Sequence, residues 1–187
     1  EETIKTLVEA GLRHLLIGLE SGKDDSLKRL NKMTTVAQNE RAIAILRKHG
    51  IEPNIGFIMF EPYSTLEDIR TNLEFLQRND LLNNLSITAN VLYHHQIVLK
   101  GSPAFKTLHD DGLLVLSPDE GYEGTAAFVD TRVAGLADLM RQITNSVFLR
   151  MWGIWSGKEL EPSGAADRYA RINGLLVDLF EHHLHGL

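Results

Sequence analysis

Residues 14–19 read HLLIGL, and residues 54–60 read NIGFIMF. Both are short, continuous apolar runs, which is the pattern of strands buried on both faces of a parallel sheet. Between them, residues 36–49 carry apolar side chains at helical spacing; Thr35 can cap that helix and Gly50 ends it. A strand, a helix and a second strand in this order predict a right-handed βαβ unit.

The same alternation continues on both sides of this unit. We expect a helix over residues 1–11, a short helix over 23–31, and a helix over 65–78 opened by a capping box of Ser64 and Glu67. Residues 85–92 predict a third buried strand. Three strands in about 80 residues are too few to close an eight-stranded barrel. The sequence therefore predicts an α/β fold, half of a barrel or open parallel sheet.

The pattern changes after Gly101. We expect a short helix over residues 103–110, a turn-rich loop over 117–125, and two long helices over 133–155 and 165–185. The chain is therefore divided into residues 1–115, which form the α/β half-barrel, and residues 116–187, which form a loop and a helical C-terminal region.

Composition narrows the functional classes. The 187 residues are 43% hydrophobic, which is enough for a core, and their net charge of −6 argues against sequence-independent nucleic-acid binding. The sequence contains no cysteine, which excludes a disulfide, a thiolate nucleophile and a thiolate-held zinc or iron–sulfur cluster within these residues. A signal pattern and an apolar run of membrane-spanning length are absent, so we expect a cytoplasmic protein.

Candidate ligand-binding residues follow the predicted strands, because ligands of parallel α/β folds bind beyond the carboxyl ends of strands. Glu20 and Ser21 follow the first strand, Lys32 follows the short helix, and Gly56 and Ile58 lie in the second strand. The alternatives are structural: Glu20 and Ser21 can cap a helix, Lys32 can be a solvated helix-end lysine, and Ile58 can be core.

Four segments carry a family resemblance: residues 17–22 (IGLESG), 30–35 (LNKMTT), 42–51 (AIAILRKHGI) and 54–67 (NIGFIMFEPYSTLE). In order and spacing they resemble the C-terminal half of a radical S-adenosylmethionine (radical SAM) domain, in particular the Fe–S oxidoreductase subgroup that also carries a cobalamin-binding domain. Residues 100–105 (KGSPAF) are similar to the segment that follows the sixth strand of that family. The resemblance implies a partial (β/α)6 TIM-like barrel, of which this chain supplies strands four to six.

The resemblance also implies a chemistry. Members of the family hold a [4Fe–4S] cluster in a Cys-x3-Cys-x2-Cys loop and cleave S-adenosylmethionine to a 5′-deoxyadenosyl radical. By position, Glu20 and the adjacent Ser21 would meet the ribose or methionyl end of the cofactor, and Lys32 would pair with its methionyl carboxylate. Gly56 and Ile58 would line the adenine and ribose, although many relatives have a polar residue in place of Gly56.

The missing cysteines are the main departure from the family. We expect this chain to be an inactive fragment whose partner is the N-terminal half of the same polypeptide, with a Cys-x3-Cys-x2-Cys stretch within about one hundred residues before Glu1. We expect the complete protein to use cobalamin and to act on a small-molecule substrate by methyl transfer, cyclisation or oxidation. We expect the fragment alone to bind no cofactor tightly.

Two other function classes were compared with this one. The first is a non-catalytic α/β interaction module that pairs through an open strand edge. The second is a phosphate-binding barrel, which is disfavoured because Glu20 would repel an anion in the Gly18–Gly22 loop.

Histidines and aromatic residues form the remaining candidates. His94 and His95 end the predicted third strand, and at most one of them points inward, as an acid–base group or as a ring bonded to backbone. The histidines of residues 182–185 could bind a metal, but a solvated tail is favoured. An apolar stripe on the first long helix is interpreted as core, although it could also drive dimerisation; it comprises Phe148, Met151, Trp152 and Trp155.

Overall fold

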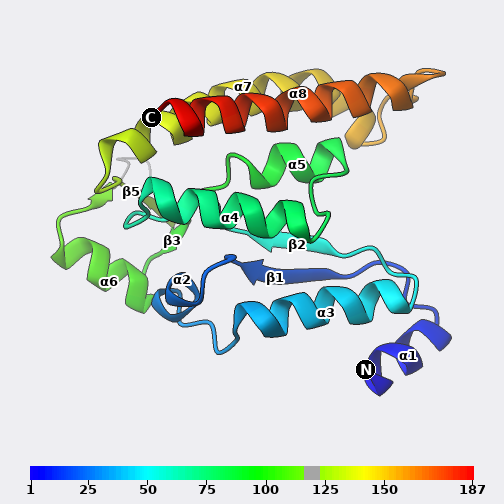
Figure 1. Cartoon of the computed structure of the whole chain (residues 1–187), viewed down its shortest axis with the longest axis horizontal. Helices are drawn as coiled ribbons and strands as arrows, with labels where there is room; N and C mark the ends of the chain where they lie inside the picture. Colours follow the sequence, from blue (N-terminus) through cyan, green and yellow to red (C-terminus); the bar gives the residue numbers. More distant parts are fainter. Residues whose placement is uncertain (116–122) are drawn as a thin grey trace.

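The structure is a computed structural model that describes residues 1–115 and 123–187 (Figure 1). Its helices are α1 (Glu2–Glu9), α2 (Asp24–Arg29), α3 (Val36–Lys48), α4 (Leu66–Arg78), α5 (Leu85–Val91), α6 (Pro103–Asp110), α7 (Thr131–Trp155) and α8 (Ala165–Gly186). Its strands are β1 (Leu16–Glu20), β2 (Asn54–Phe57), β3 (Val98–Leu99), β4 (Leu114–Val115) and β5 (Glu123–Ala126).

The predicted βαβ unit is confirmed. β1 and β2 are parallel and in direct register, with Gly18 opposite Gly56, and α2 and α3 connect them. Thr35 caps α3 as expected: its hydroxyl accepts a hydrogen bond from the Gln38 backbone N–H, and the Gln38 side chain accepts one from the Thr35 N–H. This reciprocal cap fixes where α3 begins.

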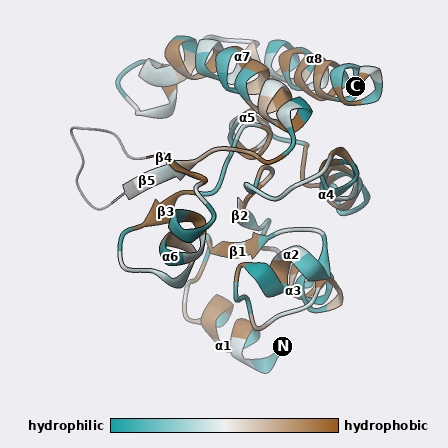
Figure 2. Ribbon diagram, turned by 90° about the vertical axis from the view of Figure 1, so that its left-hand side faces the viewer, coloured by the Kyte–Doolittle hydropathy of each residue, from teal (hydrophilic) through white to brown (hydrophobic). Residues whose placement is uncertain are grey.

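One face of the β1–β2 pair is covered by helices. Side chains alternate along a strand, so Leu19, Ile55 and Phe57 point to the same face, and each is at most 4% exposed. Both α3 and α4 lie on this side of the strands (Figure 2). The core they share includes Ile43 of α3 and Ile69 of α4. The strands therefore contribute a half-buried sheet rather than the doubly buried sheet that their apolar runs predicted.

The opposite face carries Leu16, Gly18, Gly56 and Ile58. Leu16 is 66% exposed, although it is a large apolar residue in a strand. Gly18 is exposed, and Gly56 and Ile58 are half-buried. We call this the open face of the β1–β2 pair.

The predicted third strand is wrong, because residues 85–91 form the helix α5. The Asn84 side chain accepts hydrogen bonds from the backbone N–H groups of Ser86 and Ile87, which caps the helix. The buried residues Leu85, Thr88 and Ala89 follow helical spacing. A second parallel pairing does exist later in the chain, but it is reduced to one bridge between Phe60 and His95.

Two local predictions also need correction. The capping box of α4 consists of Thr65 and Asp68, one residue later than Ser64 and Glu67. Within the predicted 117–125 loop, residues 123–125 belong to β5, which pairs antiparallel with β3 and β4, while residues 117–122 lie outside the described residues. The α/β part therefore carries a small antiparallel sheet at one end.

The two long helices of the C-terminal region are confirmed. α7 and α8 run side by side along one side of the molecule, and α8 packs on α5 (Figure 1). Met140 of α7 and Phe180 of α8 are fully buried in the same core as β2. Within the described part of the chain, no helix is long and apolar enough to cross a membrane.

The apolar stripe on α7 is divided between core and surface. Met151 is buried, and the rings of Phe148 and Trp155 pack edge to face with centroids 5.6 Å apart. Trp152, by contrast, is 63% exposed, and the Lys158 ammonium lies over its ring. The core interpretation therefore holds for three of its four members.

Candidate functional site

Glu20 ends β1 in a backbone conformation that residues other than glycine rarely adopt. Its φ is +63°, and a β-bulge shifts the register between Gly18 and Glu20. The turn is held on both sides: the Ser21 N–H donates to the Leu19 carbonyl at 2.8 Å, and the Ile58 N–H donates to the Glu20 carbonyl at 2.8 Å. A left-handed conformation costs a non-glycine residue about 1–2 kcal/mol, so the surrounding structure fixes this carboxylate in place.

Lys32 reaches Glu20 because the chain reverses after α2. Asn31 takes a left-handed φ of +54°, and the Lys32 N–H donates to the Leu27 carbonyl at 2.8 Å, which closes the end of the helix. The Lys32 Nζ then lies 3.0 Å from the Glu20 Oε1, with side chains 35% and 24% exposed. Lys32 and Glu20 thus lie at the same end of the sheet, as their shared role in the resemblance requires.

The Glu20–Lys32 pair lies over Gly18. A Cβ at Gly18 would collide with the Glu20 carboxylate and lie 2.9 Å from the Lys32 Nζ. Next to it, a Cβ at Gly56 would lie 3.6 Å from the Gly18 Cα, an ordinary contact distance. The two glycines therefore leave a flat backbone surface beside an ion pair, which a planar or polar ligand could approach closely.

Ser21 has a different environment from Glu20. It is buried, and its hydroxyl donates to the Asn72 side-chain oxygen at 2.9 Å. The same oxygen accepts the Gly22 N–H at 2.8 Å. The Asn72 amide nitrogen in turn donates to the Met59 carbonyl at 3.3 Å. Asn72, which the sequence reasoning missed, therefore ties the loop after β1 to the segment after β2; a polar residue on the buried face of α4 is the signal that points to it.

A second missed network holds α2. Glu61, only 4% exposed, accepts hydrogen bonds from the Ser26 hydroxyl at 2.9 Å and from Arg29 Nε at 3.0 Å. Because Glu61 follows β2 and Arg29 ends α2, this pair fixes the helix that precedes Lys32. A buried carboxylate of this kind is stable only with such partners.

His94 and His95 lie in the short segment that pairs in parallel with Phe60, where the sequence predicted a third strand to end. Burial lowers the pKa of His94, with the charge of His95 adding to this effect and that of Glu20 opposing it. Burial and the positive charge of Arg141 lower the pKa of His95. Burial is therefore the main cause of both shifts, and the neighbouring charges differ: His95 and Glu20 act on His94, and Arg141 acts on His95.

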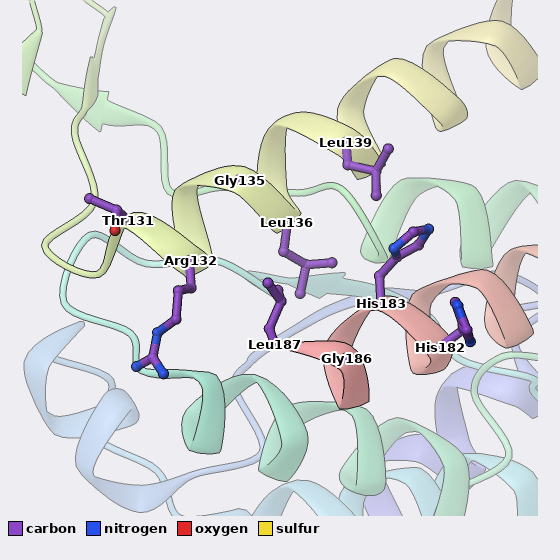
Figure 3. A pocket seen from close by; sticks show the side chains of 9 residues that line it. All are labelled: Thr131, Arg132, Gly135, Leu136, Leu139, His182, His183, Gly186 and Leu187. Atoms are coloured by element: carbon purple, nitrogen blue, oxygen red, sulfur yellow. The ribbon is translucent and has the colours of Figure 1, made fainter.

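A separate pocket lies between the start of α7 and the end of α8 (Figure 3). Arg132, His182 and His183 line it, and the two imidazole rings are 5.4 Å apart in an edge-to-face arrangement. Nowhere in the described ranges do three His, Cys, Asp or Glu side chains gather as metal ligands would. The residues that line this pocket belong to α7, α8 and Leu187, whereas the Glu20–Lys32 pair belongs to the β1–β2 unit.

Comparisons with known proteins identify similar chains. Residues 1–76 match the family described as the Radical SAM superfamily. The chain is 43% identical over 74 residues to 4′-phospho-dehydrooxetanocin synthase of Priestia megaterium, a match that covers 39% of this chain and 10% of that protein. It is 32% identical over 81 residues to bacteriochlorophyllide d C-8(2)-methyltransferase of Chlorobaculum tepidum, covering 42% of this chain and 18% of that protein.

The fold has a solved counterpart. The structure of the cobalamin-dependent S-adenosylmethionine radical enzyme OxsB with aqua-cobalamin bound matches with a TM-score of 0.75 and 22% sequence identity. That match covers 96% of this chain and 31% of the OxsB chain. The α/β part and the C-terminal helices thus occur together in a known fold, and this chain spans under a third of the length of these similar proteins.

Proposed function

Because residues 1–76 match the Radical SAM superfamily, we propose that residues 1–115 are the C-terminal half of the barrel of a longer radical SAM enzyme. The observation that carries this proposal is the Glu20–Lys32 pair, held over Gly18 at the carboxyl end of β1. Ligands of parallel α/β folds bind at this end of the strands. The open face of the β1–β2 pair is then the surface that receives S-adenosylmethionine.

The residues of the open face suit that ligand. An ammonium has three donors, so Lys32 can bind Glu20 and still donate to the methionyl carboxylate. Glu20 can accept hydrogen bonds from ribose hydroxyls, and the half-buried Ile58 offers an apolar contact for adenine. Gly18 and Gly56 allow the ligand to approach the backbone. Ser21 acts through its buried bond to Asn72, which fixes the loop that carries Glu20.

The donor set for an iron–sulfur cluster is not in this sequence, because the 187 residues contain no cysteine. In the proposed enzyme the cluster ligands come from another segment of the polypeptide, the N-terminal half of the barrel. That half would pair along the free edge of β1, which has β2 as its only strand partner among the described residues. Bound to such a cluster, S-adenosylmethionine supplies an organic radical that removes hydrogen from a substrate.

The subgroup proposed is the cobalamin-associated one, with a small-molecule substrate. Its support is the fold shared with OxsB, whose structure holds aqua-cobalamin, and the similarity to a synthase and a methyltransferase. Methyl transfer is the reaction we propose first, with cyclisation and oxidation as the alternatives.

The test is the affinity for S-adenosylmethionine, measured by calorimetry on the complete protein with its cluster assembled. Lys32→Gln should weaken binding about 10- to 100-fold, the loss expected for a hydrogen bond to a charged group. Lys28→Gln is the matched control: Lys28 lies on α2 with its side chain 76% exposed, so its loss should leave the affinity unchanged. The electron paramagnetic resonance spectrum should show an intact cluster in both variants.

Equal affinities of the Lys32→Gln and Lys28→Gln proteins would contradict the proposed cofactor face. A complete protein without three cysteines in its remaining segments would contradict the proposed enzyme class itself, and the interaction module would then be the better interpretation.

A further inference from the structure

A second hollow lies where the first half of α7 faces β5 and the segment around His95. Its volume is about 370 Å³. Its lining includes three alanines, Ala126 of β5 with Ala134 and Ala137 of α7, together with His95, Asp138 and Arg141. In Figure 1 the arrows of β1 and β2 point toward the end of the molecule where β3 and β5 lie, so this hollow is at the same end of the sheet as the Glu20–Lys32 pair.

The hollow follows from the order of residues on α7. Positions 134, 137, 138 and 141 lie three or four residues apart and therefore share one helix face. Alanines at the first two positions leave space against β5 that a larger side chain would fill. Asp138 and Arg141, one turn later, place charged groups at the edge of that space.

The charged residues of the hollow form one exposed ion pair, between the guanidinium of Arg141 and the carboxylate of Asp138. Arg141 donates to the Asp138 Oδ1 at 2.6 Å, and the Gln142 amide donates to the Asp138 Oδ2 at 2.7 Å. The side chains of Arg141 and Asp138 are 60% and 54% exposed, and an exposed pair of this kind is worth at most about 1 kcal/mol. Arg141 can therefore turn to a ligand while Gln142 continues to hold Asp138.

His95 supplies the second polar group. It is half-buried, and it lines the same hollow as Arg141. Burial favours the neutral ring, and a neutral imidazole donates from one nitrogen. A guanidinium fork and an imidazole N–H that line one hollow with small apolar side chains can bind a planar or tetrahedral anion attached to a small organic body.

We infer that this pocket binds the anionic group, a phosphate or a carboxylate, of a small molecule. The inference concerns binding alone and goes beyond the proposed function, since the site uses none of the residues of the open face. The hollow lies at the same end of the sheet as the Glu20–Lys32 pair (Figure 1).

The test uses small ions that each carry a methyl reporter: methyl phosphate, acetate and, as the cation control, tetramethylammonium. Saturation-transfer difference NMR on the complete protein reports which methyl protons contact it. We expect a signal from at least one anion and none from tetramethylammonium. The stronger of the two anion signals identifies the phosphate or the carboxylate as the preferred group.

Charge-matched variants locate the binding. Arg141→Gln should weaken the anion about 10-fold or more, the loss of a charge-assisted hydrogen bond. Arg150→Gln removes the same charge from the same helix at a different hollow and should change the affinity less than twofold. Equal weakening in both variants, equal signals from anions and cation, or the absence of any anion signal would overturn the inference. Because Arg141 is exposed, the variant should melt like the parent protein.

Discussion

The two faces of the β1–β2 pair belong to the same strands but serve different purposes. On the covered face, Leu19, Ile55 and Phe57 are 2–4% exposed and pack with helices. On the open face, Leu16 is 66% exposed, and two glycines leave the backbone accessible beside Glu20 and Lys32. The covered face has the composition of a folding core. The open face has little side-chain packing and instead holds charged groups in fixed positions.

This difference separates stability from ligand binding within a few residues. Each fully buried large apolar side chain contributes about 1.5–3 kcal/mol to folding. The open face contributes little of this kind, and it includes a strained residue, Glu20. Strained backbone persists only where the surrounding contacts hold it, and such residues concentrate at functional sites. Variants on the covered face should therefore lower the free energy of unfolding, whereas variants on the open face should lower the affinity for the ligand.

The largest contrast is expected between Phe57→Ala and Leu16→Ala. Phe57 is 2% exposed and stacks on Phe75 with ring centroids 5.9 Å apart, so its truncation should lower the free energy of unfolding by about 3–5 kcal/mol. Leu16→Ala on the open face should cost less than about 0.5 kcal/mol in these described surroundings. Urea denaturation measures both. A large loss from Leu16→Ala in the complete protein would mean that another segment covers the open face.

Asn72 connects the loop after β1 with the segment after β2, and its replacement should have the next largest effect. Asn72→Ala leaves the Ser21 hydroxyl and the Gly22 N–H without their acceptor in a buried site. We expect the free energy of unfolding to fall by about 1–3 kcal/mol, the cost of unsatisfied buried polar groups. Asn83→Ala, at an exposed position, is the control and should change it by less than about 0.5 kcal/mol. Comparable losses in the two variants would show that the Asn72 bonds carry no special weight.

The glycines sharpen the comparison on the open face itself. A Cβ at Gly18 displaces the Glu20–Lys32 pair, so Gly18→Ala should weaken binding of S-adenosylmethionine about tenfold, because a charge-assisted contact is misplaced. A Cβ at Gly56 makes only an ordinary contact, at 3.6 Å from the Gly18 Cα. Gly56→Ala should therefore have a smaller effect, unless the ligand itself occupies that space.

Calorimetric titration of the two alanine variants separates these outcomes. If Gly56→Ala is the more damaging, the ligand contacts the backbone at β2 more closely than at β1. Unchanged affinity in both variants would argue against a ligand on the open face.

The smallest effect concerns pH. Burial lowers the pKa of His94 and of His95 below the ordinary value of 6.5, aided by their positive neighbours. The unfolded chain therefore takes up protons near pH 6.5, whereas the folded chain resists them until lower pH. Stability should consequently fall as the pH drops below about 6.5.

The double variant His94→Asn with His95→Asn should flatten this fall, as measured by urea denaturation between neutral and acid pH. His185→Asn, at an exposed position near the end of α8, should keep the slope of the parent protein. A parent profile that is flat over this range would contradict the burial argument for the two rings.

The sequence predicted local structure correctly where a single interaction between neighbouring residues decides it. Thr35 followed by Gln38 predicts a helix start, because the cap needs only neighbouring residues. Likewise, a turn residue such as Asn31 after a short helix predicts the reversal that brings Lys32 to Glu20. The family resemblance of the first part of the chain came from the order of such segments, and the match over residues 1–76 agrees with it.

The α5 segment shows where such signals fail. Residues 85–92 are apolar enough for a buried strand, and a run of this length suits a short helix equally well. The Asn84 cap was the signal that favoured the helix. Packing decided between a strand and a helix for this segment. Residues of α5 at helical spacing face α8, a helix that begins only at Ala165.

The sequence by itself determined the βαβ unit, the cap of its helix α3 and the residues placed after its strands, because apolar periodicity and capping depend on near neighbours. Only the tertiary structure decided that α5 is a helix, that Asn72 and Glu61 hold the loops of the site, and that the alanines of α7 leave a hollow against β5. Each of these depends on groups many residues apart. Burial against a distant element outweighs local propensity, since apolar area removed from water stabilises more than the small differences between helix and strand preference.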